Sequence, residues 1–320
     1  MMRIVIQGAG ALGSILAAHL ARSGVDVVLL ARGARAVQVP EQGVIITGLI
    51  EAQVPVPVAT DPATLEGADL LVTTVKTYQT DTALAQVRHL NVGSVLSVQN
   101  GVLKNEQLAA VFGPEQVLGA VAAISGEVLS DGRVLFTANR GLYVGEPAGR
   151  LSSRVEAIVR AFDAAGIVAI ASEDIAIAEW SKFVSWGAVM ALSVLTRLET
   201  WKFLSDAGSA QVAASMVREA VAVAAARGVA VDDSGPLPSA TIATADEKAA
   251  CEAVQAAGRH FAEAAPRHRM STLQDLDHGR HLEVEETLAF LLKLAREHGI
   301  AAPVTTEICG LVQAIDHFQD

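Results

Sequence analysis

Short apolar runs separated by helix-forming segments characterise the first half of the chain. Four runs have the length and the Val, Ile and Leu content of buried parallel strands: residues 3–7, 26–31, 69–74 and 94–98. The segments between them, such as the Ala- and Leu-rich residues 14–22, favour helices. Because strand and helix alternate, we predict a doubly wound α/β sheet.

The remaining strands of this half are shorter. Residues 44–58 alternate between apolar and polar and predict short antiparallel strands that decorate the sheet. Further strands are expected at residues 117–124, 134–138 and 142–145. A helix at residues 152–165 and a strand at 167–170 would end the first domain, at residues 1–172.

Beyond residue 172 the apolar positions follow a helical period. Helices are expected at about residues 173–195, 209–227, 240–264, 282–298 and 304–318. Pro236, Pro266 and Pro303 fall at the breaks, as is usual for helix ends. Residues 173–320 are therefore expected to form an all-helical second domain.

Net charge, apolar stretches and cysteine spacing exclude several classes of binding partner and site. A net charge of −11 argues against nucleic acid or an anionic membrane. No apolar stretch is expected to span a membrane and no targeting segment is expected, so we anticipate a cytoplasmic protein. Cys251 and Cys309 form no CxxC pair, which excludes disulfide frameworks and zinc ribbons. The apolar C-terminal helices would allow a homodimer without requiring one.

A glycine-rich turn joins the first strand to the first helix. Its residues are Gly8, Ala9, Gly10, Ala11, Leu12 and Gly13. Gly8 permits the turn, Gly10 allows backbone to approach a pyrophosphate, and Gly13 lets helix and strand pack closely. The helix that follows would direct unpaired N–H groups at phosphates. An ordinary glycine turn is the alternative, but the strand–turn–helix context favours a Rossmann-type dinucleotide site.

Arg32 ends the second strand, where NAD-binding sites usually carry Asp or Glu. An arginine there accommodates a 2′-phosphate, so we predict NADP(H), with Arg35 as a second basic contact. The alternative is a solvated arginine. Lys76 and Asn100 follow the next two strands, at the edge where open α/β sheets bind ligands. A solvated lysine and an Asn-Gly turn are the competing interpretations.

The first helix of the second domain carries Lys182, Trp186 and Met190 on one face. A lysine beside two large apolar groups is suited to proton donation, although a lysine that merely extends from a packed helix fits the periodicity better. A second polar group of residues comprises Ser271 to Asp275 and Arg280 to Glu286. His278 and His281 with Asp275 and Asp277 match no standard metal-ligand spacing, so no metal site is predicted.

These motifs together resemble the ketopantoate reductase (2-dehydropantoate 2-reductase) family over nearly the whole chain. They are residues 8–13, Arg32, residues 75–79, residues 99–101, residues 179–183, residues 271–275, Glu283, and residues 298–300 with Pro303. The resemblance implies NADPH-dependent reduction of a 2-oxoacid to a 2-hydroxyacid. It also implies that Lys182 is the general acid and that Glu283 orients it and contacts the substrate or the nicotinamide ribose.

By the same resemblance, Ser271 would hold the substrate carboxylate, and Asn100 and Lys76 would line the nicotinamide end of the site. The chain departs from the family where asparagines are expected after the lysine and after Glu283: Trp186, Met190 and Leu288 stand there. We therefore expect a substrate more apolar than ketopantoate, with Trp186 and Met190 facing it. The alternatives are a dehydrogenase of another hydroxy or amino acid, or a non-catalytic NADP(H) sensor.

Overall fold

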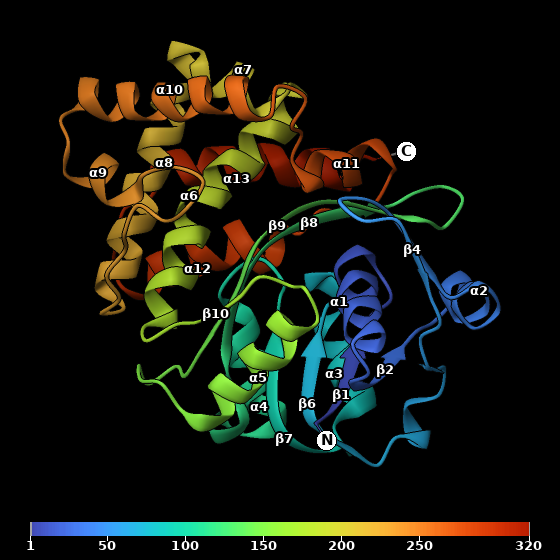
Figure 1. Cartoon of the computed structure of the whole chain (residues 1–320). Coiled ribbons are helices and arrows are strands. Elements are labelled where there is room, and N and C mark those ends of the chain that lie inside the picture. The colour runs from blue at the N-terminus through green and yellow to red at the C-terminus, as the bar shows by residue number, and fades with distance from the viewer. Residues whose placement is uncertain (1, 320) are drawn as a thin grey trace. The chain divides into compact units, whose positions relative to one another are not determined.

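The computed structural model describes residues 2–319 and divides the chain into two compact units. An α/β unit contains residues 2–100 and Lys104–Ala176, and a helical unit contains Gly101–Leu103 and residues 177–319. The expected order, a parallel sheet followed by helices, is confirmed (Figure 1). The short segment Gly101–Leu103, which belongs to the helical unit, was not expected.

The core of the α/β unit is a five-stranded parallel sheet. Its strands, in spatial order, are β5 (Val58–Ala59), β2 (Asp26–Leu30), β1 (Arg3–Gln7), β6 (Gly67–Thr73) and β7 (Asn91–Ser97). In the central strand, Ile4 pairs with Val27 on one side and Leu70 on the other. All four pairings are parallel, so the ends at Gln7, Leu30, Thr73 and Ser97 lie along one edge.

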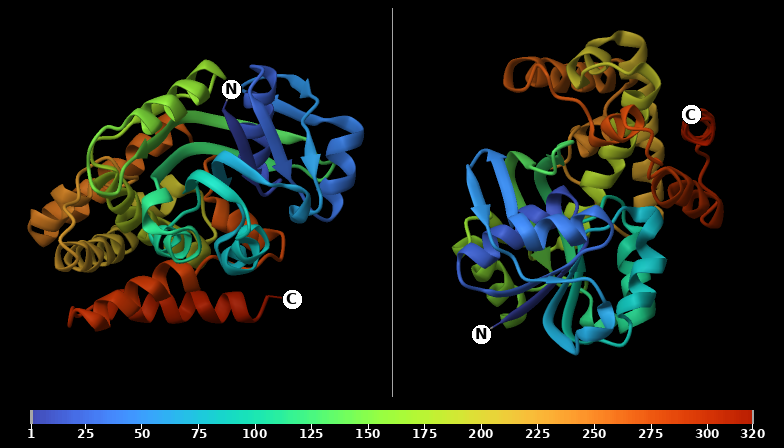
Figure 2. Two further views of the ribbon diagram at one scale, coloured as in Figure 1. Left: turned by 90° about the horizontal axis from the view of Figure 1, so that it is seen from below. Right: turned by 90° about the vertical axis from the view of Figure 1, so that its right-hand side faces the viewer.

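Alternate residues of these strands supply two separate cores. Ile4 and Ile6 pack with α1 (Ala11–Arg22) and α5 (Ser153–Ala164). Val5 lies on the other face, with α3 (Thr80–Val87) and α4 (Leu103–Phe112). The two further views show α1 and the α3–α4 pair on opposite sides of the strands (Figure 2). The sheet is thus doubly wound, as predicted.

A second sheet holds the strands that were predicted to decorate the first. Its order is β10 (Ala169–Ala171), β9 (Val134–Gly145), β3 (Val44–Gly48) and β4 (Ala52–Val54), and β8 (Gly119–Val128) also pairs with β9. β3 and β4 are antiparallel to each other as expected, but β3 pairs on its other side with β9 and not with the first sheet. The two strands expected between residues 134 and 145 form one, and its pairing with β8 is irregular at two places. Helix α2 (Ala34–Gln42) follows β2.

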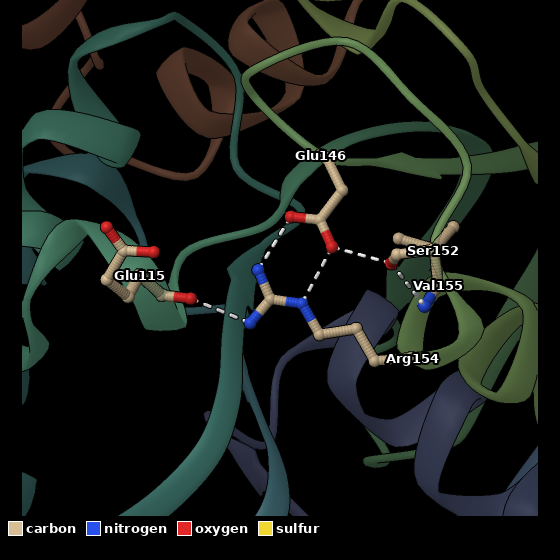
Figure 3. Close-up of polar contacts among 5 residues, drawn as sticks. All are labelled: Glu115, Glu146, Ser152, Arg154 and Val155. Atoms are coloured by element: carbon tan, nitrogen blue, oxygen red, sulfur yellow. Dashed lines mark hydrogen bonds and ion pairs between the residues drawn. The ribbon is translucent and has the colours of Figure 1, made fainter.

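An ion pair joins the end of β9 to α5. Arg154 donates from Nε and Nη2 to the two carboxylate oxygens of Glu146, at 2.7 and 2.6 Å (Figure 3). Its Nη1 donates to the carbonyl of Glu115, and Ser152, the N-cap of α5, donates to Glu146. Arg154 lowers the pKa of Glu146. Since β9 runs antiparallel to β8, this pair lies away from the edge where β1 and β6 end.

The helical unit is built around α6 (Ile175–Thr196). The other helices are α7 (Thr200–Ser205), α8 (Ala207–Ala226), α9 (Ser239–Thr244), α10 (Glu247–Ala264), α11 (Ser271–Asp277), a π-helix (Glu285–Ala289), α12 (Phe290–Glu297) and α13 (Pro303–His317). The helix expected at residues 240–264 is interrupted because Asp246 caps the start of α10 through Ala249 N–H, at 2.8 Å. The π-helix and the short α7 and α11 were not predicted.

Contrary to expectation, α6 has the length and hydropathy of a membrane span, and it is the one such helix among residues 2–319. Within the structure, 78% of its apolar window is buried, and its apolar side chains belong to one core with those of α8. A core helix meets the same criteria of length and hydropathy.

Candidate cofactor and substrate sites

The glycine turn has the backbone geometry that a dinucleotide site needs. Gly8 has φ +115°, and a side chain at Gly13 would overlap the Gly8 carbonyl. At Gly10, in contrast, no atom lies within 4 Å of the position that a Cβ would take. The turn is therefore closed at Gly13, where helix and strand meet, and open at Gly10, where a pyrophosphate would approach.

The two arginines after β2 differ in their surroundings. Arg32 is exposed directly beyond the strand, as expected for a group that could meet a 2′-phosphate. Arg35 is half-buried and donates to four protein oxygens, which include the Ala9 carbonyl at 3.1 Å. These bonds engage the Arg35 guanidinium within the α/β unit. The expectation that Arg35 is a second phosphate contact stays a prediction.

Gln99 brings together the loops that carry Lys76 and Asn100. Its Nε2 donates to the Val75 carbonyl and to Thr80 Oγ1, both at 2.8 Å, and its Oε1 accepts from Ser97 at 2.7 Å. The Lys76 and Asn100 backbones are thus held at neighbouring strand ends. Gln99 was quoted in the family motif, but only the structure reveals this bridging role.

A buried lysine supports the same loop. Lys104, 4% exposed, donates to the carbonyl oxygens of Gln99 at 3.1 Å and Ala120 at 2.6 Å. It was missed because lysines are rarely buried, and nothing in the surrounding sequence distinguishes it from a solvated residue.

In the helical unit, α6 carries Lys182, Trp186 and Met190 at the expected spacing. Lys182 is half-buried and Trp186 is 5% exposed, whereas Met190 is 0% exposed and belongs to the core of the unit. The predicted substrate contact of Met190 therefore lacks any exposed surface. Its burial agrees with that of α6 as a whole, since 78% of the apolar window of the helix is buried.

Glu283 is buried (5% exposed) two residues before the π-helix. Its carbonyl accepts a hydrogen bond from Thr287 Oγ1. α6 lies close by: a Cβ at Gly187 would be 3.3 Å from Cδ2 of Leu288. Gly101 also packs on this segment, because a Cβ at Gly101 would be 3.3 Å from Cγ2 of Thr287. Glu283 and Lys182 thus belong to adjoining elements, and π-helical turns are frequent at functional sites.

A loop that sequence reasoning overlooked holds α6 one residue before Lys182. The Asp232 N–H donates to Ser181 Oγ at 2.8 Å, and Ser185 donates to the Ser181 carbonyl at 2.9 Å. Gly235 lies so close to Ser181 that any side chain there would overlap the helix. The Gly235-Pro236 pair, which was interpreted only as a break between helices, is the feature that could have indicated it.

Ser271 is exposed and begins α11, while Asp275 of the same helix is buried and pairs with Arg280 at 3.5 Å. Asp277 pairs with Arg269, and His281 lies 3.7 Å from Asp316. Among residues 2–319, no group of three or more His, Cys, Asp or Glu side chains is arranged to hold a metal ion.

The fold and these sites define an oxidoreductase class, in which a glycine-turn dinucleotide sheet is followed by a helical unit. The model of the family described as ketopantoate reductase PanE/ApbA matches residues 4–149, and the model of its C-terminal domain matches residues 174–316. The chain belongs to the ketopantoate reductase family, whose members are nicotinamide-dependent reductases of small molecules.

Individual relatives agree over the full length. A 2-dehydropantoate 2-reductase of Archaeoglobus fulgidus is 30% identical over 316 residues, which cover 99% of this chain and 98% of that protein. The crystal structure of a PanE/ApbA family ketopantoate reductase from Ralstonia eutropha JMP134 is similar with a TM-score of 0.84, 28% identity and 99% of both chains covered. A D-mandelate dehydrogenase solved with NADH has the same TM-score over 100% of both chains, but at 20% identity this likeness concerns the fold alone.

Proposed function

We propose that the protein reduces a 2-oxoacid to a 2-hydroxyacid with NADPH, and that Lys182 is the general acid. The observation that carries the proposal is the packing of α6 against the π-helix at Gly187 and Leu288, which joins the elements bearing Lys182 and Glu283. The open approach at Gly10 and the exposed Arg32 support NADPH as cofactor.

Each residue then has a defined role. The glycine turn and Arg32 would hold NADPH, which would supply the hydride for the new C–H bond at C2 of the substrate. Lys182 donates a proton from Nζ to the former carbonyl oxygen as the C=O π bond breaks, and it is reprotonated from solvent. Glu283 orients the lysine, and Ser271 binds the substrate carboxylate. Asn100 and Lys76 position the nicotinamide end.

The substrate is proposed to carry an apolar side chain. Trp186 stands where the family usually has an asparagine. An indole at this position leaves a substrate hydroxyl without a partner, which costs about 1–3 kcal/mol. Ketopantoate is therefore expected to be a poor substrate beside 2-oxoacids with hydrocarbon side chains.

The test is the oxidation of NADPH with a panel of 2-oxoacids that includes ketopantoate. Turnover that is fastest with apolar side chains supports the proposal, and fastest turnover with ketopantoate contradicts the pocket assignment. If only the reverse reaction proceeds, with NADP⁺ and a hydroxy or amino acid, the protein is a dehydrogenase. Cofactor binding without turnover of any panel member would indicate a sensor.

We further propose that the enzyme acts in the cytoplasm, where NADPH is available, and that it forms a homodimer. The acidic composition and the apolar C-terminal helices support this assignment. Sedimentation equilibrium of the purified chain tests the dimer, and a monomer at all concentrations would contradict it.

A further inference from the structure

Arg35 is the most extensively bonded side chain near the glycine turn. It lies in the first turn of α2 and donates to Ser14 Oγ at 2.9 Å, Ala9 O at 3.1 Å, Gln38 Oε1 at 2.8 Å and Gly132 O at 2.6 Å. All four acceptors are uncharged oxygens. Burial lowers the pKa of Arg35 from its usual value, but a guanidinium remains charged at any physiological pH.

The bond to Ala9 fixes one peptide of the turn. The Ala9 carbonyl accepts from Arg35 Nε and also from Ser14 Oγ, at 3.2 Å. In a trans peptide the C=O and the following N–H point in opposite directions. With the Ala9 carbonyl held toward Arg35, the Gly10 N–H is directed away from Arg35. Gly10 is the exposed residue of the turn, with open space around it.

Arg35 also fastens a hairpin to this turn. The loop between β8 and β9 reverses at Gly132, which has φ +83°, and Arg35 donates from Nη1 to the Gly132 carbonyl. Gln38, one helical turn along α2, donates to the Asp131 carbonyl at 3.1 Å. The arginine therefore connects three segments of the α/β unit: the glycine turn, α2 and the hairpin tip.

We propose that Arg35 is a positioning residue for the dinucleotide pyrophosphate, acting through the Ala9–Gly10 peptide, and that it does not bind the 2′-phosphate. The inference rests on the proposed NADP(H) function. NADPH and NADH share the pyrophosphate and differ only in the 2′-phosphate. A residue that organises the turn therefore affects both cofactors by the same factor, whereas one that binds the 2′-phosphate affects NADPH alone.

The experiment compares the Kd values of NADPH and NADH in three variants by fluorescence titration. Arg35→Met is expected to raise the Kd of each cofactor about tenfold or more, while the ratio of the two Kd values stays constant. Arg32→Ala is expected to reduce the preference for NADPH, which is the Kd of NADH divided by the Kd of NADPH. Arg133→Met is the matched control, because this exposed hairpin arginine pairs only with the exposed Asp131 in the bonds described for it, and neither Kd should change.

A second comparison separates positioning from folding. At saturating cofactor, Arg35→Met should retain kcat while the KM for cofactor rises. If Arg35→Met does not fold, Gln38→Leu, which removes one acceptor and the bond to Asp131, should give a smaller but equally unselective loss. A loss of affinity for NADPH alone, or unchanged affinity for both cofactors in Arg35→Met and Gln38→Leu, overturns the proposal. If the wild type binds neither cofactor, the proposed function itself fails.

Discussion

Arg32 and Arg35 lie three residues apart, yet only Arg32 is exposed, and this contrast determines which one can recognise the cofactor. We expect NADPH to bind the wild type well over tenfold more tightly than NADH, because an arginine–phosphate pair is charge-assisted and often bidentate. Arg32→Ala should remove most of this preference. Titration of both cofactors into both proteins is the measurement, and equal affinities in the wild type would contradict the assignment.

Lys182 is the residue on which turnover should depend most. Lys182→Ala is expected to lower kcat by roughly 10²–10⁴-fold, the usual range for a positioned general acid, with cofactor affinity nearly unchanged. Glu283→Ala should also slow turnover, and the double variant should be less than additive if the two residues act as a unit. Steady-state kinetics on the best substrate provide the test. A near-normal kcat in Lys182→Ala would leave it as a lysine that merely packs on α6.

Among the helices and strands, those whose position follows from a local pattern of apolar residues could be predicted from the sequence. The buried strands β1, β2, β6 and β7 carry continuous apolar runs, and each was expected within three residues of its observed bounds. The grouping of β3 and β4 with β9 depends on pairings between distant segments, which a local period cannot reveal. The π-helix at Glu285–Ala289 was not predicted either, because no pattern in the sequence distinguishes it from an α-helix.

The same distinction applies to the site. The spacing of the glycines and the position of Arg32 follow from the strand–turn–helix pattern and were predictable. The bridge made by Gln99, the support given by Lys104 and the internal bonds of Arg35 depend on where distant carbonyl groups lie in space. No sequence motif encodes them.

On α6, Trp186 and Met190 should respond differently to the same change. Trp186→Asn is expected to raise kcat/KM for ketopantoate relative to apolar 2-oxoacids by roughly tenfold or more, because the amide offers hydrogen bonds to a hydroxyl. Met190→Asn would place an amide in the core and should instead lower the free energy of unfolding, by about 1–3 kcal/mol.

The control for Trp186 is Trp201→Phe, since Trp201 lies on α7, where its indole N–H donates to the Pro266 carbonyl and Lys202 lies over its ring. Measuring kcat/KM on both substrate types and urea unfolding for all three variants separates the two effects. An unchanged substrate preference in Trp186→Asn would show that this indole does not face the substrate.

For the molecule as a whole, stability at acid pH should depend on His19. The ring is 2% exposed, and its Nδ1 bonds the Ala165 carbonyl at 2.9 Å, which links α1 to the segment before β10. Nε2 is buried without a hydrogen-bond partner in the part of the chain described. Burial lowers the pKa of His19, and Arg22 adds to this, while the Ala165 bond opposes it.

Because the folded pKa is lowered, the unfolded chain binds the extra proton as pH falls below about 6.5, and the folded state loses stability there. Each unit of difference corresponds to about 1.4 kcal/mol. His19→Gln, which keeps an amide donor for Ala165 but cannot titrate, should lose less stability between about pH 7 and pH 5. Urea unfolding at several pH values tests this, and parallel curves for the two proteins would contradict it.

The short segment Gly101–Leu103 has a consequence for how this protein could be divided or recombined. It lies within the sequence of the α/β unit, yet Val102, 9% exposed, belongs to the core of the helical unit. A gene fragment ending at residue 176 would therefore carry an apolar side chain without its packing partners, and the complementary fragment would lack that side chain in its core. Exchange of units between relatives is thus expected to succeed only when residues 101–103 are transferred together with the helices.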